Sequence, residues 1–311
     1  MPGGARHGRD RWLTVWFAVL VGWTVLRWVD APGPAPVVQA LLVPAALTLP
    51  VLLVLALHRR RWPVVAGALV LGVVLGYVAA PWLGGPRLGR SEGDLVVAAA
   101  NLQFGAGDLA DVEELVREQG VDVLVLAEAS AATEEWLHGS WLEEQLPHRS
   151  GRSAEDAGGT LVLTRRPHEQ LASPEGTGFD QVVVEVDGVR VVGAHTFPPL
   201  MLSSARWRAE LALVERWLQG VEDGPLVVAG DLNASTGHPA LRDLMATNGL
   251  LDAHQVAGRG WVRSWHVGSV VPGFVHIDHV LVRGRPVADA GTTRVGDTDH
   301  LAVWARVAPP R

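Results

Sequence analysis

The 311-residue sequence has no cysteine, no lysine and a single tyrosine. Without cysteine, the chain cannot form a disulfide scaffold, a thiolate zinc site or a cysteine nucleophile. All 26 strongly basic residues are arginine, which we attribute to a GC-rich genome rather than to a functional site. The composition is also not that of a disordered chain, because 48% of the residues are hydrophobic.

Charge is divided unevenly along the chain. Residues 1–93 carry nine arginines and three acidic residues, a balance of +6. Residues 94–311 carry 17 arginines and 30 acidic residues, a balance of −13. The length is typical of about two domains, and the charge places a boundary between them near residue 93. The acidic surplus of the second part counts against tight binding of nucleic acid.

Long apolar runs are confined to the first part. They predict three transmembrane helices over about 12–29, 36–57 and 62–83, since ~20 helical residues cross a ~30 Å hydrocarbon core. The second and third runs contain no charged residue. The first run, preceded by arginines, can also be interpreted as a signal peptide, but its length favours a retained span.

Arginine counts predict the orientation in the membrane. The tail 1–11 and the loop 58–61 carry three arginines each, so both are expected in the cytoplasm. Three spans then leave everything from residue 84 onward outside, and cleavage of the first run would give the same result. Residues 84–93 are rich in glycine and polar residues and are predicted to be a linker.

From residue 94 the pattern alternates between strands and helices. Short apolar runs predict strands over 95–102, 121–127, 161–164, 181–186, 189–194, 226–229, 277–282 and 301–307. Helical spacing of apolar residues predicts helices over 108–119, 130–146, 204–219 and 238–248. The mixture of hairpins and strand–helix units favours an α/β fold with mixed sheets.

Polar side chains recur where the predicted strands end or begin. Each one alone also suits a turn, a helix cap, a solvated loop or a buried core position. Their joint occurrence favours a shared crevice at one edge of the sheets. The residues are Asn101, Glu128, His195, Asp231, Asn233, Asp278, Asp299 and His300.

This set is chemically coherent. Four of its members, Glu128, Asp299, Asp231 and Asn101, are hard oxygen ligands that suit Mg²⁺ or Mn²⁺ rather than Zn²⁺. His195 and His300 can partner an anion, and Asp278 can orient one of the imidazoles. The chemistry indicated is metal-assisted attack of water on a phosphate ester.

The segments ANLQFG, VDVLVLAEAS, VVGAHTFPP, VVAGDLNAS, HIDHVLVRG and DTDHLAVWARV resemble the endonuclease/exonuclease/phosphatase superfamily, which has the deoxyribonuclease-I-like fold. The resemblance covers about residues 94–308, the expected catalytic domain. The pair Ser264-Trp265 resembles the Thr-Trp often found before the Ile-Asp of this family. The family implies two mixed β-sheets packed face to face with outer helices, a four-layer sandwich.

The resemblance implies that Glu128 is the principal metal ligand, with Asn101 beside it and Asp299 assisting. The implied cofactor is Mg²⁺ or Mn²⁺. Gln103 stands where many nuclease members carry an aspartate, which puts a second metal ion on that side in doubt. The only tyrosine, Tyr77, lies in the third apolar run, so the catalytic tyrosine of abasic-site endonucleases is missing.

The resemblance also implies the reacting groups. His195 would contact the scissile phosphate, Asp231 would activate or orient water, and Asn233 would orient it or stabilise the transition state. Asp278 would pair with His300, which would bind phosphate and stabilise developing negative charge. Whether an aspartate or a histidine acts as general base is left open by the family itself.

We therefore predict a membrane-anchored, divalent-metal-dependent phosphoesterase that acts outside the cytoplasm on a nucleic acid or a phospholipid headgroup. The lipid bilayer is an expected partner, and no protein partner is evident. Arg206 and Arg208 are the nearest candidates for phosphate-backbone contacts, or else form a solvated helix face. The alternatives are a non-catalytic module that binds a phosphorylated ligand, and a three-span scaffold with an unrelated α/β domain.

Overall fold

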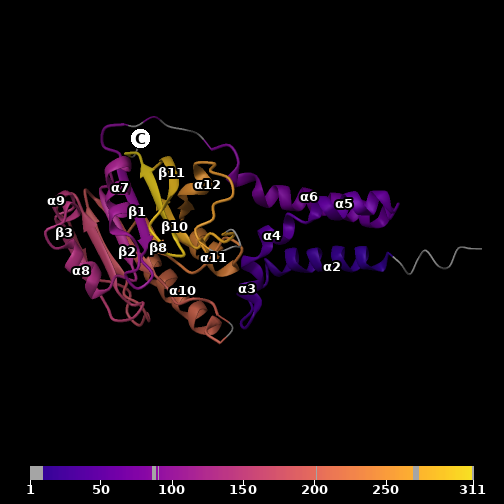
Figure 1. The fold of residues 1–311 in the computed structure, drawn as a ribbon, viewed down its shortest axis with the longest axis horizontal. Coiled ribbons are helices and arrows are strands. Elements are labelled where there is room, and N and C mark those ends of the chain that lie inside the picture. The colour runs from indigo at the N-terminus through magenta and orange to yellow at the C-terminus, as the bar shows by residue number, and fades with distance from the viewer. Residues whose placement is uncertain (1–9, 86–88, 90, 201, 269–272, 310–311) are drawn as a thin grey trace, which may run out of the picture.

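The computed structural model describes residues 10–85, 89, 91–200, 202–268 and 273–309 (Figure 1). Two parts are evident, a helical stalk (residues 11–83) and a β-sandwich (residues 95–307). Of the predicted tail, residues 1–9 lie outside the described residues. Of the predicted linker, residues 86–88 and 90 do so as well.

The stalk consists of helices that extend away from the sheets (Figure 1). Helices α2 (Arg11–Leu26), α5 (Leu49–His58) and α6 (Trp62–Ala79) pack on one another around a buried apolar cluster that includes Leu13 and Leu52. Nineteen of the 24 large hydrophobic side chains exposed in the described part of the chain lie between Trp12 and Leu83. The stalk is therefore apolar on its outside as well as inside.

A helix that crosses a bilayer must be both long and apolar. Within the described residues, one stretch is long and apolar enough to cross, Trp62–Trp82, formed by α6 and the 3₁₀ helix η1 (Ala80–Trp82). The stretches Arg11–Leu26 and Leu42–His58 are apolar but shorter. The structure therefore supplies one full-length candidate span, and the other two predicted spans are not shown by it.

The run over 36–57 does not form one continuous helix. It is divided into α3 (Ala35–Ala40), α4 (Leu42–Ala46) and α5. A proline lies in the first turn of each of these helices, at Pro36, Pro44 and Pro50. Proline has no N–H to donate and disfavours a helical conformation in the residue before it, so each proline can begin a helix but interrupts a longer one.

The sandwich contains two six-stranded mixed sheets. The first has the strand order β11-β12-β1-β2-β4-β3 and the second β5-β6-β7-β8-β10-β9. The strands of the first sheet are β1 (Leu95–Asn101), β2 (Val123–Ala127), β3 (His148–Arg152), β4 (Thr160–Thr164), β11 (Val287–Arg294) and β12 (Leu301–Val307). Those of the second are β5 (Glu169–Leu171), β6 (Val182–Val186), β7 (Val189–His195), β8 (Leu226–Asp231), β9 (Leu251–Asp252) and β10 (Asp278–Arg283).

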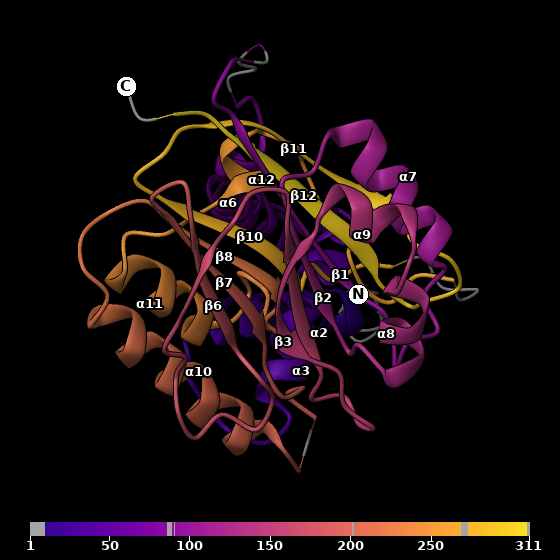
Figure 2. The same ribbon diagram turned by 90° about the vertical axis from the view of Figure 1, so that its left-hand side faces the viewer.

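The sheets pack face to face, and helices cover their outer faces. Valines such as Val125 of the first sheet and Val227 of the second share one buried core. The outer face of the first sheet is covered by α7 (Leu109–Gln119), α8 (Ala131–Leu137) and α9 (Trp141–Gln145), and that of the second by α10 (Ser204–Gln219) and α11 (Pro239–Thr247) (Figure 2). The predicted four-layer α/β sandwich is confirmed.

Local differences from the predicted elements have local causes. The predicted helix 130–146 is divided into α8 and α9, because Gly139 adopts a φ of 72° and Ser140 caps a new helix by accepting from the Glu143 N–H. Strands β3, β5, β9 and β11 were not predicted. They are short or partly exposed, so the sequence offers no continuous apolar run there.

Strand pairing brings distant residues to one edge. Strands β1 and β2 are parallel, as are β7 and β8, so Asn101 lies opposite Ala127 and His195 opposite Asp231. Strand β10 runs antiparallel to β8 with Asp278 opposite Asp231. The ends of both parallel pairs and the start of β10 therefore meet at the same edge of the sandwich.

The sandwich is docked on the end of the stalk. The Nε2 of His238 lies 2.8 Å from the Pro36 carbonyl oxygen, and Arg242 donates to the Arg27 carbonyl at 2.6 Å. On the other side, the Gly260 N–H donates to the Trp82 carbonyl at 2.7 Å. Hydrogen bonds thus join the two parts both before α3 and after α6.

Candidate active site

The structure brings all eight predicted site residues together at the edge where these strands meet. Five of them are buried, namely Asn101, His195, Asp231, Asp278 and His300. Glu128, Asn233 and Asp299 are partly exposed. Buried polar groups are stable only when they have partners, and contacts within the set supply partners for Asn101, Asp231, Asp278 and His300.

Asn101 links two carboxylates. Its Nδ2 donates to Glu128 Oε1 at 2.9 Å and to Asp231 Oδ2 at 3.0 Å, while its Oδ1 accepts from the Gln103 N–H at 2.9 Å. Asn101 ends β1 and Glu128 follows β2, so this amide joins the ends of two neighbouring strands. Its second hydrogen bond joins them to Asp231 at the end of β8 in the facing sheet. Both carboxylates are thereby held side by side.

Glu128 presents its carboxylate at the mouth of the cluster. Its backbone adopts a φ of 54°, a left-handed conformation that is uncommon outside glycine and recurs at functional sites. Its Oε2 accepts from the Phe104 N–H at 3.2 Å. Burial raises the pKa of Glu128, although the hydrogen bond from Asn101 opposes that effect.

His300 is held as a cation. Its Nδ1 lies 3.0 Å from Asp278 Oδ2, while its Nε2 lies 3.9 Å from Asp231 Oδ2 and 3.7 Å from Asp299 Oδ1. Burial alone would lower the pKa of His300, but Asp278, followed by Asp231 and Asp299, raises it to about 10. The ring therefore carries a positive charge at neutral pH.

Asp231, Asn233 and His195 form the opposite wall. Asp231 Oδ1 accepts from the Asn233 N–H at 2.8 Å, and Asn233 Nδ2 donates to the Thr196 carbonyl at 2.8 Å. Burial and the nearby Asp278 raise the pKa of Asp231. His195 Nε2 lies 3.9 Å from Asp231 Oδ2 and from Glu128 Oε1. Burial lowers the pKa of His195 to about 4, so this ring is neutral.

Supporting residues were not singled out as site residues in the sequence. Ser264 Oγ accepts from the Asp278 N–H at 3.0 Å, and Trp265 Nε1 donates to Asp299 Oδ2 at 3.0 Å. The Thr298 hydroxyl accepts from the His300 N–H at 2.9 Å. In the sequence, two features indicate these contacts. One is the Ser264-Trp265 pair, and the other is the position of Thr298 within the D-T-D-H segment.

The donor set fits a hard divalent cation. Glu128, Asp299 and Asn101 offer oxygen atoms, and no thiolate is available. Four carboxylates face one another, with His300 the only imidazole among them that is held as a cation. Asp231, Asp278 and His300 also lie close enough to share an ion. However, both Asp278 oxygens lie within 3.1 Å of His300 Nδ1 and are engaged by it.

The two arginines considered for phosphate contacts have other partners. The Arg206 guanidinium lies over the Phe197 ring at 3.5 Å from its centroid. Arg208 Nε lies 2.6 Å from Asp30 Oδ2 in the segment between α2 and α3. Arg208 therefore contributes to docking of the sandwich on the stalk, and Arg206 to packing near the site.

The comparisons with known proteins agree with this geometry. A model of the Endonuclease/Exonuclease/phosphatase family matches residues 98–300, which include all eight site residues. No curated protein matches the sequence significantly.

Solved structures with the same fold include an AP endonuclease from Archaeoglobus fulgidus, with a TM-score of 0.54 and 15% identity over 68% of this chain and 98% of that one. D. rerio TDP2 in complex with a single-strand DNA product has a TM-score of 0.52 and 14% identity, over 70% of this chain and 99% of that one. At these identities the likeness shows the fold alone.

Proposed function

Because the chain belongs to the endonuclease/exonuclease/phosphatase family, we propose that it is a membrane-anchored, divalent-metal-dependent hydrolase of phosphate esters that acts outside the cytoplasm. The observation that carries the proposal is the convergence of four carboxylates, two amides, one neutral histidine and one cationic histidine on one edge of the sandwich. A module that only binds a phosphorylated ligand needs a charge complementary to the phosphate. It does not need the neutral His195 and the cationic His300 on either side of the Asp231 carboxylate.

The proposed cation is held by Glu128 and Asp299 with Asn101 beside them. When bound, Mg²⁺ or Mn²⁺ would offset the acidic surroundings and stabilise negative charge on the phosphate oxygens. Asn101 fixes the distance between Glu128 and Asp231 through its two donated hydrogen bonds. Its proposed role is to hold the Glu128 carboxylate, which binds the metal ion, at a fixed distance from the Asp231 carboxylate, which orients water.

The reacting groups follow from their contacts. Asp231, oriented by the Asn233 N–H, is placed to orient water and to take its proton. His300 Nδ1 is engaged by Asp278, which leaves its Nε2–H to donate to a phosphate oxygen as negative charge develops. His300 is therefore not available as the base. The neutral His195 is placed to donate a hydrogen bond to the phosphate from the opposite side.

Within the two predicted substrate classes, we favour phosphate esters of lipid headgroups over nucleic acid. The sandwich part of the sequence has a balance of −13, and Arg206 and Arg208 are engaged by Phe197 and Asp30. Proteins that bind nucleic acid tightly present clustered basic residues to the phosphate backbone. The D. rerio TDP2 structure holds a DNA product, which makes nucleic acid the second arm of the test.

Three features of the stalk support membrane anchoring. Its outer surface is apolar. Asp10, directly before α2, forms an ion pair with Arg59 at 3.2 Å, so the start of α2 and the arginine-rich loop between α5 and α6 lie at the same end of the stalk. The sandwich is docked at the other end. We propose that the arginine-rich end faces the cytoplasm and the sandwich faces outward.

Hydrolysis tests the activity. The full chain in detergent is incubated with bis-(p-nitrophenyl) phosphate, phospholipid vesicles and plasmid DNA, with Mg²⁺ or with EDTA. We expect EDTA to abolish turnover, and Glu128→Gln and His300→Ala each to lower kcat/KM by ~10²-fold or more. Glu175→Gln and His138→Ala, both at exposed positions, are the matched controls and should retain activity.

Turnover that persists in EDTA, or in both site variants, would exclude the mechanism. Phosphate-ester binding by calorimetry without turnover of any substrate would support the alternative of a non-catalytic phospholigand-binding module.

A reporter fused after Arg311 tests the orientation. Alkaline phosphatase is active only outside the cytoplasm, so a fusion at this position should be active. Green fluorescent protein fused at the same position should not be fluorescent. The reverse pattern would overturn the extracytoplasmic placement without affecting the enzymatic proposal.

A further inference from the structure

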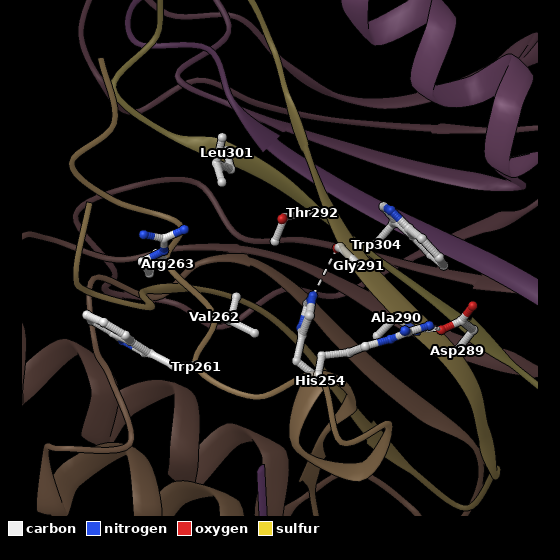
Figure 3. Close-up of a pocket in the computed structure, with 11 residues that line it drawn as sticks. His254, Trp261, Val262, Arg263, Asp289, Ala290, Gly291, Thr292, Leu301 and Trp304 are labelled. Carbon is white, nitrogen blue, oxygen red and sulfur yellow. Dashed lines mark hydrogen bonds and ion pairs between the residues drawn. The ribbon is translucent and has the colours of Figure 1, made fainter. Parts of the chain in front are cut away.

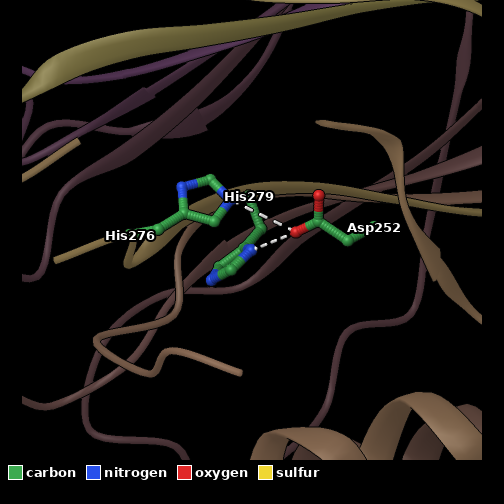
Figure 4. A group of neighbouring side chains, drawn as sticks. All are labelled: Asp252, His276 and His279. Carbon is green, nitrogen blue, oxygen red and sulfur yellow. Dashed lines mark hydrogen bonds and ion pairs between the residues drawn. The ribbon is translucent and has the colours of Figure 1, made fainter. Parts of the chain in front are cut away.

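A second buried polar cluster lies on the stalk-facing side of the second sheet, and the proposed reaction does not use it. It contains Asp252 at the end of β9, His276 just before β10 and His279 within β10 (Figure 4). His254 in α12 (Ala253–Val256) is its fourth member. All four side chains are at least nine-tenths buried. Adjacent strand residues point to opposite faces, so His279 points away from its catalytic neighbour Asp278.

The three imidazoles converge on the Asp252 carboxylate. Its Oδ2 lies 2.6 Å from His279 Nδ1 and 3.2 Å from His276 Nε2, and its Oδ1 lies 3.9 Å from His254 Nδ1. Ligand atoms of Asp252, His276 and His279 all lie within 4.8 Å of one another. This spacing is compatible with three bonds of ~2.0–2.2 Å to one central ion after small adjustments, and His254 Nδ1 is the candidate for a fourth.

Two of the histidines are oriented as metal-binding histidines are. His254 Nε2 lies 2.9 Å from the Gly291 carbonyl oxygen, and His279 Nε2 lies 2.8 Å from the Ala234 carbonyl oxygen. A carbonyl only accepts, so each Nε2 carries the hydrogen and the other nitrogen, Nδ1, is directed at Asp252. Metal-ligating histidines almost always donate their second ring N–H in this way.

One of these nitrogens lacks a hydrogen-bond partner. His254 Nδ1 is buried and has no partner within the described residues. In the neutral ring it presents a lone pair toward an acceptor oxygen of Asp252 at 3.9 Å. Asp252 Oδ1 also caps α12 by accepting from the His254 and Gln255 N–H groups at 2.9 and 3.1 Å. The unpartnered atom is therefore His254 Nδ1, and a cation bound there would satisfy its lone pair.

We propose that Asp252, His254, His276 and His279 form a zinc site separate from the catalytic cluster. Three imidazoles and one carboxylate make up a nitrogen-rich set that suits Zn²⁺ with four-coordinate geometry. Mg²⁺ prefers an all-oxygen set such as that around Glu128. The two centres therefore differ in the ion that each one selects.

A cavity borders the proposed site at His254. A cavity of about 400 Å³ is lined by His254, Trp261, Val262 and Thr292, among others (Figure 3). The His254 ring forms part of its wall, and His254 is one of the two imidazoles of this cluster, with His276, whose Nδ1 has no hydrogen-bond partner within the described residues. A metal site must be reachable as well as geometrically suitable.

The position of the cluster indicates a structural role. The His276 ring contacts the Trp82 ring edge-on at 5.7 Å between centroids, at the end of the stalk. Ala234, which holds His279 Nε2, directly follows Asn233 of the candidate active site. Zinc at this position would brace the entry of the stalk into the sandwich and the loop that carries Asn233.

Metal analysis tests the proposal. The full chain is purified in detergent with an affinity tag that contains no histidine, equilibrated with Zn²⁺ and gel-filtered. Zinc is then measured by mass spectrometry. We expect about one zinc per chain, and at least ~10²-fold weaker zinc binding in His254→Ala and His276→Ala. His168→Ala, a histidine outside both clusters, is the matched control and should keep its zinc.

Glu128→Gln separates the two centres, because it alters the catalytic cluster and should leave zinc bound. A wild-type protein without zinc, zinc retained in His254→Ala, or zinc lost in Glu128→Gln would each overturn the proposal. These outcomes are independent of whether the protein hydrolyses phosphate esters.

X-ray absorption at the zinc edge of the wild-type protein keeps the test valid if the variants do not fold. The expected spectrum has nitrogen and oxygen neighbours at ~2.0–2.1 Å with the outer-shell scattering of several imidazoles. A shell of oxygen neighbours without imidazole scattering would refute the proposed site.

Discussion

At the scale of single residues, the candidate active site depends on a few positions whose backbone or burial is unusual. Glu128 and Asn233 adopt left-handed backbone conformations, and Gly230 has a φ of 143° next to Asp231. A Cβ on Gly230 would lie under 3 Å from the Ala194 carbonyl oxygen. The missing side chain therefore lets β7 and β8 approach each other where His195 and Asp231 pair.

Gly230→Ala should lower both stability and activity. We expect the free energy of unfolding to fall by roughly 2–4 kcal/mol, because the new Cβ must push β7 from β8. Hydrolysis should fall at least ~10-fold, because a shift of about 1 Å between His195 and Asp231 disturbs the site. Denaturant titration followed by tryptophan fluorescence, together with initial rates, measures both effects.

Gly224→Ala is the matched control. No atom lies within 4 Å of the position of its Cβ, so stability should change by less than about 0.5 kcal/mol. Equal losses in the two variants would mean that the close approach of β7 and β8 is not what Gly230 provides.

At the scale of elements, α3 and α11 connect the stalk to the sandwich. His238, at the start of α11, is buried, with its Nδ1 accepting from the Ser235 N–H at 2.8 Å and its Nε2 2.8 Å from the Pro36 carbonyl oxygen of α3. Burial lowers the pKa of His238 to about 4, although the Pro36 hydrogen bond opposes this. Protonation of Nδ1 would also break its bond to Ser235.

Acid should therefore weaken this docking. The folded state binds fewer protons at His238 than the unfolded state between pH 6.5 and about 4, so stability is full above pH 6.5 and falls below it. Lowering the pKa from 6.5 to about 4 corresponds to a loss of about 3 kcal/mol across that window.

In His238→Gln this contribution is absent, so melting temperatures of wild type and variant should converge as the pH falls from 7 to 4. His138→Gln, whose histidine side chain is 91% exposed, is the control for loss of a histidine. A difference in melting temperature that stays constant over this range would contradict the assignment.

At the scale of the whole molecule, the protein combines an apolar stalk with an acidic sandwich. Residues 94–311 have a balance of −13, of which Glu128, Asp231, Asp278 and Asp299 account for only four acids. The remaining acidic surplus repels polyanions over a distance set by the salt concentration. This property belongs to the surface as a whole and not to any one residue.

Hydrolysis of a polyanionic substrate should therefore increase with salt. We expect kcat/KM for DNA to rise when sodium chloride increases from about 0.02 to 0.15 M, because screening weakens the repulsion. A nuclease with a basic binding surface shows the opposite trend. Rates with bis-(p-nitrophenyl) phosphate provide the control, since this small monoanion should respond much less. A fall in the DNA rate would reveal a basic surface.

The sequence by itself determined the α/β class, the two-part organisation and the set of polar residues at strand ends. Apolar runs report buried strands wherever they are continuous, and the eight site residues stood out because each one interrupts or borders such a run. The four strands that escaped prediction are short or half-exposed, so their pairing and not their composition makes them strands.

Only the tertiary structure decided which polar groups touch. Asn101 and Asp231 are 130 residues apart, and their hydrogen bond exists because the facing sheets bring β1 and β8 together. The same holds for Asp252, His254, His276 and His279, which the sequence did not distinguish from solvated residues. Their grouping depends on the packing of β9, α12 and β10 against one another, next to the Trp82 ring that contacts His276. The local sequence pattern determines whether a segment forms a helix or a strand. Long-range packing determines the distances between the side chains of each site, because those side chains come from segments far apart in the sequence.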